Sequence, residues 1–130
     1  MKNSRTDFLL TTQARKRTRD KTHKQINIAA WNVRGYCNKE AELENELKAA
    51  KVDIAIISET KKKSRGSMEL KDYILIYSGV DKNERAQAGV AIMIDKKWKN
   101  KIQSYSFINE RILTLRLKTE RGYMNIIGVY

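Results

Sequence analysis

The sequence predicts an α/β fold in which one βαβ unit is followed by mostly antiparallel strands. Two apolar runs rich in strand-forming residues, Ile26–Trp31 and Val52–Ile57, flank a charged stretch with helical spacing. Further short apolar runs then alternate with turn-forming residues, and no second helical pattern follows. A helix between two strands is what a right-handed crossover between neighbouring parallel strands requires.

The charged stretch between the two runs predicts an amphipathic helix. Leu43 and Leu47 recur on one face, while Glu44 and Lys48 have the i,i+4 spacing of a favourable ion pair. The run Val52–Ile57 is apolar at nearly every position, which predicts a strand covered on both faces.

The remainder of the chain predicts strands joined by short connections. We expect a polar, basic loop over residues 60–67 and a second polar connection over residues 95–100. Within that connection, we expect Trp98 to be a packing anchor rather than a base-stacking platform. The expected strands cover residues 73–77, 89–94, 102–108, 112–117 and 123–130, the first two being antiparallel neighbours.

Charge and composition predict a basic arm followed by one domain. A chain of 130 residues suits a single domain, and its net charge of +12 favours a polyanionic partner. Residues 1–25 carry eight basic and two acidic residues, half of that excess, and we expect them to form a disordered arm before a domain over residues 26–130. The arm suits phosphate backbones and a nuclear location, with a solvated tail and a cytoplasmic location as the alternatives. Its most basic residues are Arg15, Lys16, Arg17 and Arg19.

Two classes of protein are disfavoured. No apolar run approaches the roughly 20 residues of a membrane span, and residues 1–24 lack the apolar segment of a secretory signal. Cys37 is the single cysteine, so no disulfide can form within the chain, which fits a reducing compartment.

Polar residues follow both strands of the βαβ unit. Asn32 comes directly after the first apolar run, and Glu59 follows Ser58 after the second. Because parallel neighbours end at the same end of a sheet, we expect Asn32 and Glu59 to lie together, where open α/β sheets bind ligands. Residues 61–63, all lysines, give this end a basic rim or form a solvated loop, and Asn32 alternatively forms a turn into Gly35.

Four stretches in this order resemble the amino-terminal half of the endonuclease/exonuclease/phosphatase superfamily. Within it, the chain is most similar to the apurinic-endonuclease-like domains of non-LTR retrotransposons and to craniofacial development protein 2-like proteins. The resemblance covers residues 26–130 and implies the first half of a two-sheet α/β sandwich. The stretches are AWNVRG (residues 30–35), ISETK (57–61), AGVAI (88–92) and NIIGVY (125–130).

The resemblance implies a divalent-metal-dependent hydrolase that cleaves phosphodiesters in DNA or RNA, with Mg²⁺ or Mn²⁺ as cofactor. It assigns Glu59 to the metal, Asn32 to the metal and the scissile phosphate, and Tyr130 to the phosphate. Arg34 stands where base-excision repair members carry an acidic residue and where the retrotransposon-type domains commonly have Arg. We therefore expect contacts with nucleic acid from Arg34, Lys61, Lys62, Lys63 and the arm.

The sequence also departs from the full pattern. It stops on an apolar run before the family's carboxy-terminal Asp and Asp-His motifs, and no histidine follows His23. We therefore expect a half-domain that is inactive alone and that self-associates through uncovered sheet surface. A non-catalytic nucleic-acid-binding module and a phosphatase of the same superfamily are the alternative functions.

Overall fold

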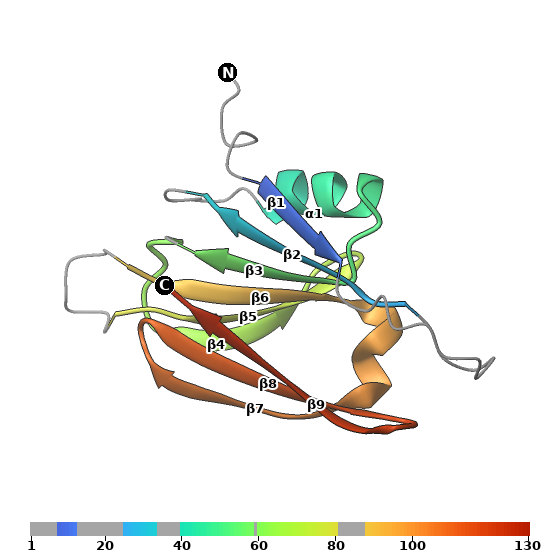
Figure 1. Cartoon of the computed structure of the whole chain (residues 1–130). Helices are drawn as coiled ribbons and strands as arrows, with labels where there is room; N and C mark the ends of the chain where they lie inside the picture. Colours follow the sequence, from blue (N-terminus) through green and yellow to red (C-terminus); the bar gives the residue numbers. More distant parts are fainter. Residues whose placement is uncertain (1–7, 13–24, 34–39, 59, 81–87) are drawn as a thin grey trace.

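The computed structural model describes residues 8–12, 25–33, 40–58, 60–80 and 88–130. Within these ranges the chain forms three layers, with a helix on one face of a large sheet and a smaller sheet on the other (Figure 1). Among the described residues, no helix has the length and apolar character that a bilayer span requires.

The large sheet has six strands in the order β1-β2-β3-β6-β5-β4. β2 and β3 are parallel and are connected through helix α1, as the βαβ pattern predicts, and all other neighbours are antiparallel. The bounds are β1 Phe8–Thr12, β2 Asn27–Asn32, α1 Glu40–Ala49, β3 Ile54–Ser58, β4 Arg65–Glu69, β5 Tyr73–Ser78 and β6 Val90–Asp95.

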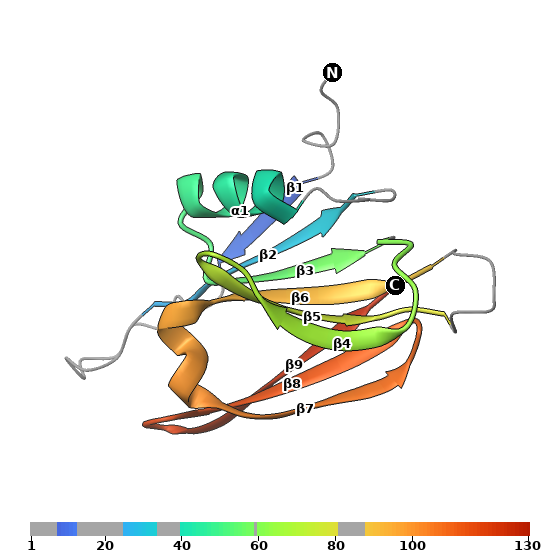
Figure 2. The same ribbon diagram turned by 180° about the vertical axis from the view of Figure 1, so that it is seen from behind.

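A three-stranded antiparallel sheet, in the order β7-β8-β9, covers the face of the large sheet opposite α1 (Figure 2). A short 3₁₀ helix, η2, links β6 to this second sheet. The expected polar connection is therefore helical, and Asp95 caps it by accepting a hydrogen bond from the backbone N–H of Lys97 (3.0 Å). The bounds are η2 Lys96–Lys101, β7 Ile102–Asn109, β8 Ile112–Thr119 and β9 Gly122–Val129.

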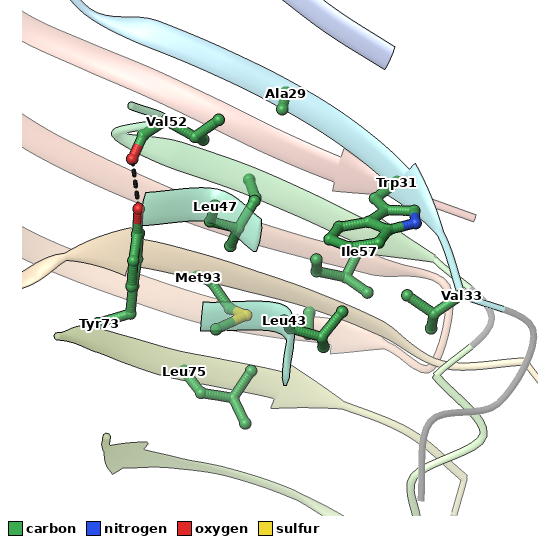
Figure 3. Close-up of a cluster of buried hydrophobic side chains, with 12 residues drawn as sticks. Ala29, Trp31, Val33, Leu43, Leu47, Val52, Ile57, Tyr73, Leu75 and Met93 are labelled. Carbon is green, nitrogen blue, oxygen red and sulfur yellow. Dashed lines mark hydrogen bonds between the residues drawn. The ribbon is translucent and has the colours of Figure 1, made fainter. Parts of the chain in front are cut away.

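One half of the core lies between α1 and the large sheet (Figure 3). Leu43 and Leu47 of α1 are buried there together with Trp31 of β2, which confirms the apolar face predicted for the helix. Buried Tyr73 fills the end of this layer and donates a hydrogen bond from its hydroxyl to the carbonyl of Val52 (2.6 Å). Burial raises the pKa of the Tyr73 hydroxyl, because the ionised form would lose its solvation.

The other half of the core lies between the two sheets. Ile54 of β3 and Ile92 of β6 face Leu113 and Leu115 of β8, and all four are buried. Successive residues of β3 and β6 enter opposite halves of the core, so both strands are apolar throughout. This confirms that the second apolar run is a strand covered on both faces.

Two segments differ from the prediction. Within the arm expected to be disordered, Phe8–Thr12 forms β1 and pairs antiparallel with β2, so that expectation is wrong for these five residues. The polar loop predicted over residues 60–67 runs into strand β4 from Arg65 onward, which pairs with β5. The sequence pattern did not predict β4, because four of its five residues are exposed and the strand has no apolar pattern.

Glu44 has a different role from the predicted ion pair. Its carboxylate accepts hydrogen bonds from the backbone N–H groups of Asp72 (2.8 Å) and Tyr73 (2.9 Å) at the start of β5. Lys48 instead contacts Asp95 (3.2 Å). Tertiary partners in the sheet have therefore replaced the local helical pairing.

Candidate metal and phosphate site

The carboxyl ends of β2 and β3 lie side by side. Asn32, half-buried, is in register with Ser58, the residue that precedes Glu59. The backbone N–H of Val33 donates to the carbonyl of Ser58 (3.1 Å), so the two chains stay joined just past Asn32. The predicted convergence of the two strand ends is therefore present. We call this end of the six-stranded sheet the site end.

The chain on either side of position 59 is anchored to β6. Ser58 pairs with Val90, and beyond position 59 the N–H groups of Thr60 and Lys61 donate to the carbonyls of Gly89 (3.3 Å) and Ala88 (2.8 Å). Glu59 itself lies outside the described residues, as does Arg34. The neighbours of the candidate metal ligand are thus held by main-chain hydrogen bonds.

Gly89 makes this close approach possible. Its φ of +107° is unfavourable for other residues, and a Cβ at this position would lie 2.3 Å from Oγ1 of Thr60. Thr60 is buried, and its Oγ1 also accepts a hydrogen bond from the N–H of Lys62 (3.2 Å). A side chain on residue 89 would therefore push away the segment that follows Glu59.

The three lysines after Thr60 have different surroundings. Lys61 and Lys63 are exposed, whereas Lys62 is half-buried with Nζ 4.7 Å from the ring centroid of Tyr77. The cation–π contact engages Lys62 in packing. Lys61 and Lys63 are therefore the two lysines of this segment whose charge faces solvent, as either a basic rim or a solvated loop requires. The arm residues Arg15, Lys16, Arg17 and Arg19 lie outside the described part of the chain.

Tyr130 lies at the site end as well. The carboxyl terminus lies near the start of β6 and the carboxyl ends of β2 and β3 in both views (Figures 1 and 2). Two residues earlier, a Cβ on buried Gly128 would be 3.3 Å from Val90, so β9 crosses β6 closely here. Tyr130 is 40% exposed, which leaves its side chain accessible from solvent.

Arg111 is a candidate residue that the sequence analysis missed. Its guanidinium lies 5.2 Å from the ring centroid of Tyr130, and its carbonyl accepts a hydrogen bond from the N–H of Tyr130 (2.9 Å). Asn109 accepts from the N–H of Arg111 (2.7 Å) and fixes the turn between β7 and β8. Arg111 and Tyr130 are distant in sequence and only the sheet brings them together, so local sequence gave no signal for this pair.

The opposite end of the sheet holds the buried carboxylates of Asp53 and Asp95, in addition to that of Glu44 at the start of β5. Asp53 accepts hydrogen bonds from the N–H of Asn27 (2.8 Å) and from Nε1 of Trp98 (3.3 Å), and it forms an ion pair with Lys97 (2.9 Å). The hydrogen bond to Asp53 raises the pKa of the Lys97 ammonium. Trp98 also packs against the core between the sheets, which confirms its predicted role as an anchor.

Asp95 lies beside Asp53. The backbone N–H of Asp95 donates a hydrogen bond to the backbone carbonyl of Asp53 (2.8 Å). The Asp95 carboxylate accepts from the N–H of Lys97 and contacts Lys48. We call the end formed by Asp53, Asp95, Lys97 and Trp98 the closed end, because these hydrogen bonds occupy both carboxylates.

The one carboxylate that the sequence offers as a metal ligand at the site end is that of Glu59. Among the described residues, no group of three or more His, Cys, Asp or Glu side chains is placed to hold a metal ion. Mg²⁺ needs only one or two carboxylates and takes its other oxygen ligands from water, amides and phosphate. The carboxylate of Glu59 and the amide oxygen of Asn32 fit this requirement in chemical type.

No family model matches the chain, but curated relatives and a solved structure do. Craniofacial development protein 2 from Bos taurus is 28% identical over 104 residues, which are 79% of this chain and 17% of that protein. The protein of the same name from Tragulus javanicus is 28% identical over the same share of this chain and 18% of its own length. The chain thus spans less than a fifth of these relatives.

The fold matches part of the catalytic domain of APE2 from Xenopus laevis. The TM-score is 0.59 at 16% sequence identity, over 79% of this chain and 44% of that domain. The predicted similarity to craniofacial development protein 2-like proteins is therefore confirmed, and so is the predicted two-sheet α/β architecture, which matches part of the APE2 catalytic domain.

Proposed function

We propose that the chain is the amino-terminal half of a divalent-metal-dependent phosphodiesterase, a DNA endonuclease of the apurinic type. The observation that carries this proposal is the register of β2 with β3, which sets Asn32 opposite the residue before Glu59. The similarity to craniofacial development protein 2 and to part of the APE2 catalytic domain supports it.

Each residue at the site end has a chemical task in this proposal. The Glu59 carboxylate and the Asn32 amide oxygen would hold Mg²⁺, which when bound offsets the charge on the phosphate and on the leaving oxygen. Tyr130, with Arg111 beside it, orients the phosphate by hydrogen bonding. Exposed Lys61 and Lys63 attract the nucleic-acid backbone.

This chain by itself binds a phosphodiester without cutting it. Hydrolysis needs a group that removes a proton from the attacking water. No histidine follows His23 in the sequence, and the buried carboxylates of Asp53 and Asp95 are engaged at the closed end. Metal and phosphate binding can therefore be measured here apart from catalysis.

The test is the affinity of the chain for a labelled duplex with one abasic site, measured by fluorescence anisotropy with and without Mg²⁺. We expect Mg²⁺ to tighten binding, with no nicking of the duplex on a denaturing gel. Glu59→Ala and Asn32→Ala should each remove the Mg²⁺ effect. The control Glu42→Gln removes an exposed carboxylate from α1 and should leave the effect intact.

Two outcomes would contradict the proposal. Binding that is equal with and without Mg²⁺ would exclude the metal site. Nicking by the chain alone would show that it holds a complete catalytic set.

A non-catalytic nucleic-acid-binding module is the second candidate. It is favoured by the net charge of +12. Such a module would bind DNA in a salt-dependent but Mg²⁺-independent way, through the arm and the lysines at the site end. For either candidate, we propose a nuclear location on the basis of the basic arm.

A further inference from the structure

The outer face of the three-stranded sheet carries a group of basic and aromatic side chains. Residues of β8 alternate between the core and this face, so Arg116 and Lys118 point away from the large sheet. In the register of β8 with β9, Arg116 is opposite Asn125 and Lys118 is opposite Tyr123, which places all four on one face. The residues of β8 that face the core are Leu113, Leu115 and Leu117.

Tyr123 holds the two cations in place. The guanidinium carbon of Arg116 lies 4.0 Å from the centroid of the tyrosine ring, and Nζ of Lys118 lies 5.9 Å from it. Because the ring quadrupole attracts both cations, it reduces the cost of placing them together. We call Arg116, Lys118 and Tyr123 the outer cluster.

The outer cluster is accessible and its charge is not neutralised. Tyr123 is 51% exposed, and Arg116 and Lys118 are exposed too. Within the described residues, neither Arg116 nor Lys118 pairs with a carboxylate. The cluster therefore presents two unpaired positive charges beside an aromatic surface, a combination that suits an anionic ligand with aromatic groups.

A depression of about 550 Å³ adjoins the outer cluster between η2 and the turn from β8 to β9. Its lining includes Trp98, Lys101, Arg121 and Tyr123, and its one acidic residue is Glu120. Tyr123 therefore borders both the open sheet face and a hollow that is itself basic and aromatic. A ligand longer than one charged group could reach both surfaces.

The outer cluster is separate from the site end. Tyr130 follows Tyr123 by seven positions along β9 and the residue after it, which corresponds to roughly 23 Å along an extended strand. A phosphate bound near Asn32 therefore cannot touch Tyr123. The two regions can be altered independently by mutation.

Charge and aromatic exposure favour single-stranded nucleic acid over other occupants. The net charge of +12 attracts a polyanion, and it opposes the self-association expected through uncovered sheet surface. Duplex DNA would offer phosphates to Arg116 and Lys118, but its paired bases could not stack on Tyr123. Unpaired bases stack on exposed aromatic rings while the backbone follows basic side chains.

We propose that the outer cluster binds single-stranded nucleic acid, with the backbone on Arg116 and Lys118 and a base stacked at Tyr123. This inference extends the proposed function from one nucleic-acid contact region to two. In this arrangement, the outer cluster holds an unpaired strand while the site end holds the phosphodiester.

The test uses the full chain and a fluorescent oligothymidylate of about 15 nucleotides, with anisotropy measured over a range of salt concentrations. The double variant Arg116→Gln/Lys118→Gln should weaken binding and lower the slope of log K against log salt by about 1.4, since each lost phosphate contact on a single strand contributes about 0.7. The matched control Lys51→Gln/Lys71→Gln removes the same charge from exposed positions away from this face and should change the slope less.

Substitutions of Tyr123 distinguish the contribution of base stacking from that of charge. Tyr123→Ala should weaken single-strand binding by about fivefold or more, whereas Tyr123→Phe should retain it, because the ring rather than the hydroxyl stacks. Circular dichroism and thermal melting would confirm that each variant is folded. Equal losses in the double variant and its matched control, or wild-type binding by a folded Tyr123→Ala, would overturn the proposal.

The proposed metal site and the proposed single-strand binding by the outer cluster can be tested separately. Asn32→Ala should remove the Mg²⁺ effect on the abasic duplex and leave oligothymidylate binding unchanged. Conversely, Arg116→Gln/Lys118→Gln should leave the Mg²⁺ effect in place. If light scattering shows instead that the outer-cluster variants change only the state of association, the face is a contact between copies and the nucleic-acid assignment is wrong.

Discussion

The two ends of the six-stranded sheet differ in how their polar groups are used. At the closed end, Asp53 and Asp95 are buried, and main-chain N–H groups and the cations of Lys97 and Lys48 occupy their oxygens. At the site end, Lys61 and Lys63 are exposed and Asn32 is half-buried, on a backbone that is itself well anchored.

This difference shows that buried carboxylates alone do not indicate a metal site. A carboxylate that accepts several hydrogen bonds has satisfied its oxygens and stabilises the fold. A binding site needs oxygen atoms that a ligand can still reach, on a backbone that does not have to reorganise. Substitutions at the closed end should therefore change stability, and those at the site end should change binding.

Asp53→Ala should have the largest effect on stability. It removes the acceptor of the Asn27 N–H, the Trp98 indole and the Lys97 ammonium, and it leaves the first two without a partner. We expect a loss of about 3 to 5 kcal/mol in the free energy of unfolding, measured by urea denaturation. A loss no larger than that of the exposed control Glu42→Gln would show that the closed end does not stabilise the fold.

Gly89→Ala should have the next largest effect, at the site end. The new Cβ would clash with Oγ1 of Thr60 and would strain a backbone with φ of +107°, at a cost of about 2 to 4 kcal/mol. The control is Gly122→Ala, where φ is +124° but no atom lies within 4 Å, so only the conformational strain of about 1 kcal/mol remains. Equal losses in the two variants would contradict the close approach at Thr60.

Tyr73→Phe should have a smaller effect that depends on pH. Losing the hydrogen bond to Val52 should cost about 1 kcal/mol near neutral pH. Burial raises the folded-state pKa of Tyr73, so its contribution is fully present below its unfolded pKa of about 10 and is lost as the pH rises above that value. The difference in the free energy of unfolding between wild type and variant should therefore become smaller above pH 10. Urea unfolding curves at pH 8 and pH 10.5 would measure this change.

Asn32→Ala should have the smallest effect on stability, within about 1 kcal/mol, because its side chain is only half-buried. The same substitution should remove the Mg²⁺ dependence of binding to the abasic duplex. Thermal melting and anisotropy on one preparation would measure both quantities. A large loss of stability without a change in Mg²⁺ dependence would show that Asn32, like Asp53, stabilises the fold and does not bind the metal.

Much of the fold could be predicted because strong apolar patterns mark buried elements. The runs at β2, β3, β5 and β6 were found within one or two residues of their observed bounds, and so was the amphipathic face of α1. The weakest predictions concern segments whose structure depends on a neighbour. β4 has four exposed residues of five, and β1 comes from a basic segment with only a brief apolar run.

The candidate site was predictable to a similar degree. The parallel pairing of β2 with β3 follows from the βαβ pattern, so the proximity of Asn32 to the end of β3 could be inferred. The roles of Glu59 and Tyr130 stay predictions. The pairing of Arg111 with Tyr130 and the cluster around Tyr123 could not be inferred, because they depend on the order and register of β8 and β9.

The sequence by itself determined which segments are buried, that β2 and β3 are joined by a helix, and that the chain is strongly basic. These properties depend on local periodicity and composition, which neighbouring residues define. Only the tertiary structure decided which polar groups are occupied and which are accessible, since hydrogen-bond partners such as those of Asp53 come from distant segments. The same physical reason distinguishes the closed end from the site end: two similar sets of polar residues differ in what the fold places beside them.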